Sequence, residues 1–143
     1  MINIGFIYAI GAAITWGLVY AIDQKILYTV SPITLLFINS VLGAVIILPL
    51  IFWGNNSIKI LLGSGKLNIS LIILSVVLAT LANFLIFSSI KSLGSSTASI
   101  IEIAYPFFVI LFAFIFFKSS PNIWFYVGGI LIFLGSAIIV WRT

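Results

Sequence analysis

The stretch SSTASIIEIAYPFFVILFAFIFF, residues 95–117, decides the fold of this chain. As a helix it is long enough to cross the roughly 30 Å hydrocarbon core of a bilayer, and its one charged residue is Glu102. Four more apolar stretches flank it, separated by charges and turn residues. We expect five membrane-spanning helices, over about residues 4–22, 33–53, 69–90, 95–117 and 122–141. The predicted fold class is therefore an all-α integral membrane protein, with residues 1–143 forming a single transmembrane domain.

The composition supports a membrane environment. Of the 143 residues, 64% are hydrophobic and 6% are charged, whereas a soluble domain carries roughly a quarter charged residues. So few charges do not cover a water-facing surface. The apolar stretches lack the period-two alternation of a membrane β-barrel, so helices are the way in which their backbone groups are satisfied in lipid.

Residue types that are rare or missing exclude several classes of function. The chain has no cysteine and no histidine, and its two acids are Asp23 and Glu102. Disulfides, zinc sites, Ser-His catalysis and carboxylate metal cages are therefore not expected, and we predict no metal, no cofactor and no enzyme activity. The six basic residues are scattered singly, which argues against a nucleic-acid partner and for loops beside lipid headgroups. Asp23 and Lys25 are expected to form a solvated pair at the end of the first span.

The basic residues divide equally between the two sides of the membrane. One side receives Lys59, Lys66 and Lys118, and the other receives Lys25, Lys91 and Arg142. The positive-inside rule then sets almost no orientation. Two interpretations stay open: a fixed orientation set by the terminal amine or a partner, and a dual topology in which copies insert both ways and pair antiparallel.

Glu102 is the most informative residue. A carboxylate at membrane depth faces a cavity or a partner in most proteins, and helical spacing places Ser95, Ser99 and Pro106 on its stripe, with Tyr105 at the border. Pro106 cannot donate to the Glu102 carbonyl, which leaves a second acceptor at the same height. One interpretation is a polar cavity that binds a cation, an amine or a proton. The other is a neutral glutamic acid bonded to a neighbouring helix beside a plain kink.

Other spans offer further lining residues. Trp16 and Tyr20 share one face of the first span, and Asn39 and Asn83 place amides in the second and third spans. Each either lines the cavity or only packs and bonds between helices. The predicted substrate- or proton-binding set is Glu102, Tyr105, Trp16, Asn39, Asn83 and Ser99, with Pro106 as the helix kink.

Small residues repeat along the fifth span. Gly128 and Gly135 are two turns apart, as are Gly129 and Ser136. Such stripes allow close helix–helix contact in membranes, either within the chain or between chains. We favour a dimer contact.

The order of these features resembles an EamA-like domain of the drug/metabolite transporter superfamily. The resembling segments are Trp16-Gly17, Ser31-Pro32, Leu93 to Ser99, Tyr105 to Phe108, Phe116 to Lys118 and Gly128 to Gly135. The last two helices also resemble those of small multidrug resistance transporters. The chain departs from those transporters in lacking a glutamate in its first span, and from many EamA-like relatives in carrying Asn39 where a basic residue is common.

Most EamA-like transporters carry two such domains in inverted orientation, and this chain has one. The resemblance therefore implies an antiparallel homodimer with a shared central cavity, acting as a secondary active transporter in the plasma membrane. The expected activity is export of a small metabolite, amino acid or lipophilic amine. The alternative is a non-transporting membrane subunit, or an obligate heterodimer partner of another five-span protein.

Overall fold

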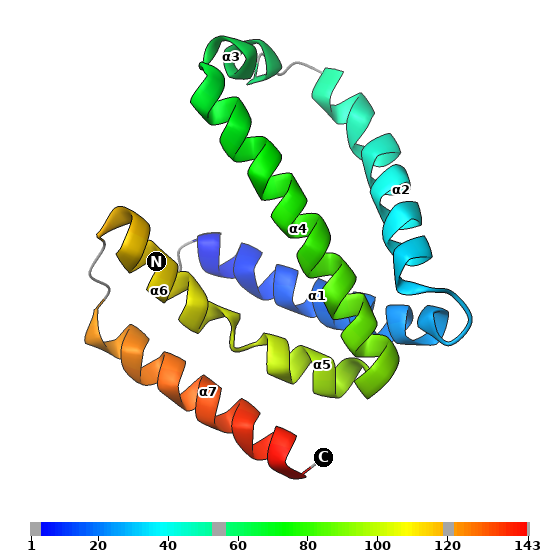
Figure 1. The fold of residues 1–143 in the computed structure, drawn as a ribbon, viewed down its shortest axis with the longest axis vertical. Helices are drawn as coiled ribbons and strands as arrows, with labels where there is room; N and C mark the ends of the chain where they lie inside the picture. The colour runs from blue at the N-terminus through cyan, green and yellow to red at the C-terminus, as the bar shows by residue number, and fades with distance from the viewer. Residues whose placement is uncertain (1–3, 53–56, 119–121, 143) are drawn as a thin grey trace. The chain divides into compact units, whose positions relative to one another are not determined.

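The computed structural model describes residues 4–52, 57–118 and 122–142, and their regular structure is helical throughout (Figure 1). The helices are α1 (Ile4–Leu27), α2 (Pro32–Phe52), α3 (Ser57–Gly63), α4 (Lys66–Leu93), α5 (Ser95–Glu102), α6 (Tyr105–Phe117) and α7 (Ile123–Arg142). Within the described residues, five spans are long and apolar enough to cross a membrane, with α5 and α6 together forming the fourth. The all-α, five-span fold is therefore confirmed, and the chain is a multi-pass membrane protein.

Two helices run beyond the apolar stretches from which they were expected. Helix α1 continues to Leu27, past the expected end at residue 22, and α4 begins at Lys66 instead of residue 69. The backbone keeps its helical hydrogen bonds across the boundary where apolar residues give way to polar ones. Residue 53, the expected end of the second span, lies outside the described residues.

The predicted solvated pair at the end of the first span is wrong for Asp23. This residue lies inside α1, with only 4% of its surface exposed, whereas Lys25 is exposed. Residues 23 and 25 point in different directions on a helix. The extension of α1 therefore turns one of them into the protein and the other outward.

The chain divides into two compact units. The first unit comprises Met1–Gln24 and Ser89–Thr143, and so contains most of α1 together with α5, α6 and α7. The second unit comprises Lys25–Ser88, with α2, α3 and most of α4. Its buried apolar side chains are Leu27, Leu35, Leu36 and Phe87. Glu102 belongs to the first unit.

The fourth span is broken near its middle. Residues Ile103 and Ala104 separate α5 from α6, and Pro106 follows in the first turn of α6. Proline is tolerated there because its missing N–H would have no helical partner in a first turn. At the break, the Ala104 N–H donates to Ile101 O over 3.2 Å, three residues back. A continuous α-helix would direct it to Ile100 O instead.

Helix α7 packs beside both halves of the broken span, as Figure 1 shows. Ser136 is buried, and its Oγ lies 2.9 Å from Ile100 O on α5 and 3.0 Å from Ile132 O on its own helix. The serine hydroxyl thus supplies a donor to a carbonyl that the break deprives of its usual partner. Beside α6, a Cβ added to Gly129 would lie 4.0 Å from the Phe107 ring, which marks a close approach of the two helices.

Most large apolar side chains of the described residues are exposed. Phe117 is 80% exposed and Trp141 is 90% exposed, and similar side chains extend along every span. In water this surface would cause aggregation, whereas in a bilayer it meets acyl chains at no such cost. The lipid bilayer is therefore the partner that covers most of the protein.

The serine at the α5–α7 contact gives a first prediction. Ser136→Ala removes the donor to Ile100 O, so the protein is expected to lose about 1 kcal/mol of stability. Thermal unfolding in detergent micelles measures the loss. Ser40→Ala is the matched control, because Ser40 Oγ bonds only to Leu36 O of its own helix at 2.8 Å. Equal melting temperatures for the two variants would contradict the prediction.

Candidate functional site

The centre of the site is a hydrogen bond between α1 and α5. The Tyr20 hydroxyl donates to Glu102 Oε2 over 2.5 Å, and both side chains are partly buried. Glu102 is the last residue of α5, where the helix dipole is negative and disfavours a carboxylate. The Tyr20 hydroxyl therefore stabilises the Glu102 carboxyl group, which the C-terminal end of α5 disfavours.

An aromatic pair extends the site along α1. Trp16 precedes Tyr20 by one helical turn, and the ring centroids are 5.7 Å apart in an edge-to-face arrangement with an interplanar angle of 63°. Trp16 is 52% exposed, so most of its ring is free to meet another molecule. The predicted lining role of Trp16 is thus compatible with its position next to the Tyr20–Glu102 hydrogen bond.

A second contact fixes how α1 lies against α5. The Ser95 N–H donates to Gln24 Oε1 over 2.7 Å, which gives a partner to one of the free N–H groups at the start of α5. Gly94, just before α5, has a φ of 83° and carries no side chain where Gln24 approaches. Because residue 24 meets residue 95 and residue 20 meets residue 102, α1 and α5 run antiparallel along this contact.

Three predicted residues lie around the break. Tyr105 begins α6, is 61% exposed and interacts electrostatically with Tyr20. Pro106 is half-buried and accounts for the break at the predicted kink. Ser99 is half-buried, but its Oγ donates to Ser96 O over 3.0 Å, so its hydroxyl is engaged with its own helix.

The two predicted amides belong to the second unit. Asn39 is exposed on α2, and Asn83 donates from Nδ2 to Ala79 O within α4 over 2.9 Å. The Tyr20–Glu102 site belongs to the first unit. Their role in a cavity stays a prediction.

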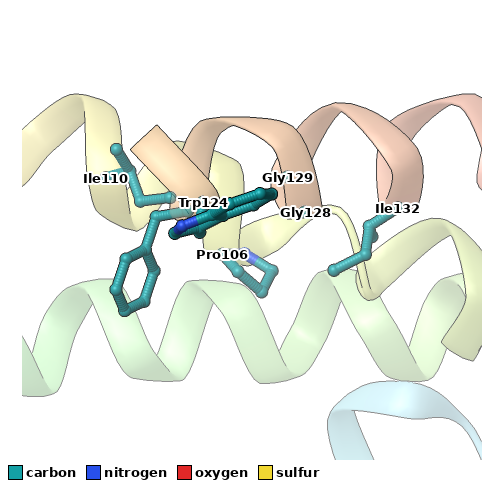
Figure 2. Close-up of a pocket in the computed structure, with 7 residues that line it drawn as sticks. Pro106, Ile110, Trp124, Gly128, Gly129 and Ile132 are labelled. Atoms are coloured by element: carbon teal, nitrogen blue, oxygen red, sulfur yellow. The ribbon is translucent and has the colours of Figure 1, made fainter. Parts of the chain in front are cut away.

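A separate apolar pocket lies between α6 and α7 (Figure 2). Its volume is about 280 Å³, and it is lined by Pro106, Ile110, Trp124, Phe125, Gly128, Gly129 and Ile132. Gly128 and Gly129 leave room there because they have no side chains. The lining offers apolar surface only, so this pocket suits an acyl chain or the apolar part of a ligand.

The small residues of α7 divide between two environments. Gly129 and Ser136 are buried, facing α6 and α5 of the same chain. Gly128 lines the apolar pocket, and Gly135 is exposed, with no atom within 4 Å of an added Cβ at either position. The internal contact that the sequence left open is thus made by Gly129 and Ser136. A role for Gly128 and Gly135 between chains stays a prediction.

Sequence reasoning missed part of this site. Tyr20 was expected to line the cavity or only to pack, not to bond to Glu102, and Gln24 was given no role. The signal was present in the spacing, because residues 16, 20, 23 and 27 recur on one helical face. Gln24 was overlooked because the first span was ended at its first charge, Asp23.

The arrangement favours binding over covalent chemistry. A carboxyl group with one phenolic partner and a neighbouring indole is suited to a proton or an organic cation, the indole adding a cation–π surface. The described residues contain no group of three or more His, Cys, Asp or Glu side chains that could hold a metal ion.

A model of the EamA-like transporter family matches residues 3–141, nearly the whole chain. The chain belongs to this family. The resemblance drawn from the sequence is thereby confirmed, and the five spans are those of an EamA-like domain. No curated protein and no solved structure gives a significant match to this EamA-like chain.

The central hydrogen bond gives a second prediction. In a double-mutant cycle of Tyr20→Phe and Glu102→Gln, the two changes are expected to be coupled by about 1.5–3 kcal/mol if the acceptor is ionised, and by about 1 kcal/mol if it is neutral. Unfolding in detergent measures the stability of each variant. The cycle of Tyr8→Phe with Glu102→Gln is the control, since Tyr8 is 69% exposed on the same helix. Additive effects of Tyr20→Phe and Glu102→Gln would contradict the contact.

Proposed function

We propose that this protein is a secondary active transporter of a small molecule, an exporter that resides in the plasma membrane and works as an antiparallel dimer around a shared cavity. Its membership of the EamA-like transporter family supports the transport activity. The observation that carries the proposal is the hydrogen-bonded carboxyl group of Glu102 directly before the break in the fourth span. In transporters, broken helices and intramembrane acids mark substrate and ion sites.

The chemistry of the site narrows the substrate class. A protonated primary amine would donate to the Glu102 carboxylate and replace the hydrogen bond from Tyr20, whereas a quaternary ammonium would pair with the carboxylate by charge alone. Trp16 and Tyr105 present exposed aromatic surface beside it, on which a lipophilic cation gains cation–π and apolar contacts. A lipophilic amine therefore fits best, and an amino acid or another small metabolite with an amino group fits next.

Three features support pairing of two copies. The chain has five spans, and two copies placed antiparallel would form the inverted repeat that many transporters encode in one polypeptide. Its six basic residues divide equally between the two sides, as dual insertion requires. Gly135 offers an open small-residue position on α7 for a close helix contact.

Transport through Glu102 gives the third prediction. Proteoliposomes with an imposed pH gradient are loaded with a radiolabelled lipophilic cation, tetraphenylphosphonium, or with labelled amino acids in parallel. Glu102→Gln is expected to reduce gradient-driven flux at least tenfold, because the charge that pairs with the substrate or proton is gone. Thr80→Val is the control, since Thr80 Oγ1 bonds within α4 to Val76 O at 2.8 Å. Unchanged flux in Glu102→Gln would remove Glu102 from the mechanism, and no flux in any protein would favour the non-transporting subunit.

The arrangement of the dimer gives the fourth prediction. Because the chain has no cysteine, each introduced thiol is unique. In an antiparallel seam along α7, Gly128 of one copy lies across from Gly135 of the other. Mixed Gly128→Cys and Gly135→Cys proteins are therefore expected to form disulfide dimers under mild oxidation, severalfold more than either variant alone.

The controls distinguish the alternatives. An added Cβ meets no atom within 4 Å at Gly128, Gly135 or Gly11, so all three positions accept a cysteine, and Gly11→Cys on α1 reports random collision. Cross-linking of each variant with itself would indicate a parallel pair. Cross-linking no stronger than that of Gly11→Cys would exclude this seam.

A further inference from the structure

A second acid lies next to the site without a role in the proposed mechanism. Asp23 follows Tyr20 by one turn of α1 and is 4% exposed. Its Oδ2 atom is buried and has no hydrogen-bond partner within the described part of the chain. Asp23 and Glu102 are the only two acids of the whole sequence, and both lie in the first unit.

A buried carboxylate without compensation is costly. Leaving its charge unpaired costs several kcal/mol, so the group takes up a proton or a cation instead. A proton is the smallest species that removes the charge, and it needs no cage of further oxygen ligands.

Tyr20 lies one turn before Asp23 on α1 and contacts Glu102 on α5. Its hydroxyl donates to Glu102 Oε2, and Tyr20 also interacts electrostatically with Asp23 and Tyr105. The other described ionisable side chains of the first unit are Tyr8, Lys91, Lys118 and Tyr126. Tyr20 is therefore the side chain through which we expect a change at Glu102 to reach Asp23.

We propose that Asp23 is a second proton-binding site of this protein, separate from the Glu102 carboxyl group and linked to it by Tyr20. At neutral pH Asp23 holds one proton while Glu102 accepts the hydrogen bond from Tyr20. When an organic cation takes the Glu102 carboxylate, the Tyr20 hydroxyl is released. The local negative charge at Glu102 is then neutralised, which lowers the cost of a negative charge on Asp23, and Asp23 gives its proton to water. One cation enters the site and one proton leaves it, so charge is balanced.

The role of Asp23 in transport rests on the proposed function, but its protonation is testable without any transport. Since the chain has one aspartate and one glutamate, labelling aspartate with ¹³C at the side-chain carboxyl marks Asp23 alone. Infrared spectra of the wild-type protein in lipid at neutral pH are expected to contain the C=O band of a protonated carboxylic acid. Aspartate labelling moves that band to lower frequency, and the same labelling of glutamate leaves it in place.

Variants test the link to Glu102. Glu102→Gln is expected to lower the intensity of the Asp23 band at neutral pH, because it removes the negative charge that favours the neutral acid. Tyr20→Phe in the Glu102→Gln background makes no further change, whereas Tyr20→Phe alone changes the band. Tyr8→Phe is the control and leaves the band unchanged.

The possible outcomes of these measurements distinguish the protonation of Asp23 from its link to Glu102. Absence of a protonated carboxyl band at neutral pH, or a band that moves with glutamate labelling alone, overturns the proposal. If the labelled Asp23 band is unchanged by Glu102→Gln, the protonation of Asp23 stands but its link to Glu102 is overturned. Since no mutation is needed for the assignment, misfolding of an Asp23 variant does not affect it. Loss of flux in Glu102→Gln, together with a protonated Asp23 band in the wild-type protein, supports both proposals, while unchanged flux together with that wild-type band removes only the mechanism through Glu102.

Discussion

A carboxyl group inside a membrane protein must find a partner, and Glu102 finds it in Tyr20. At the bilayer centre a charged side chain costs at least ~2.5 kcal/mol, and the C-terminal position on α5 adds an unfavourable helix dipole. The phenol from α1 offsets part of this cost only if α1 lies along α5. Gln24 holds the same two helices together one turn further on, through the N–H of Ser95. The position of α1 in the first unit therefore follows from the need to satisfy one acid and one helix end.

Pro106 lies at the break in the fourth span, which determines how α7 packs against α5. The helix stops at Glu102 and starts again at Tyr105, since the proline ring would clash with the Glu102 carbonyl in a continuous helix. At the break the Ala104 N–H turns to Ile101 O, and the Ile100 carbonyl takes the Ser136 hydroxyl as its donor. That contact holds α7 against α5. Pro106 also lines the apolar pocket with residues from α7 (Figure 2), so one proline adjoins both the polar site and the apolar one. A ligand with a cationic head and an apolar body would find complementary chemistry in this unit.

The sequence predicted the spans and the kink because these depend on local physics. Apolar length sets a span, and a proline in its middle breaks it, so residues 95–117 were interpreted correctly without any tertiary information. The pairing of Glu102 with Tyr20 was not predictable from the two residues, because 82 positions separate them along the chain. Asp23 was misplaced for a different reason. A charge was taken to end the helix, whereas helix α1 continues to Leu27 and carries that charge into the protein.

The Tyr20–Glu102 hydrogen bond is only partly buried in the single chain, and this bears on the proposed pairing of two copies. Trp16 and Tyr105 flank the Tyr20–Glu102 hydrogen bond, yet both are more than half exposed. Acyl chains at that position would surround a polar contact without offering any hydrogen bond. A second copy placed there would enclose the contact and supply further polar groups around the partly buried carboxyl group. The same carboxyl group that requires Tyr20 within the chain thus gives a physical reason for the proposed pairing between chains.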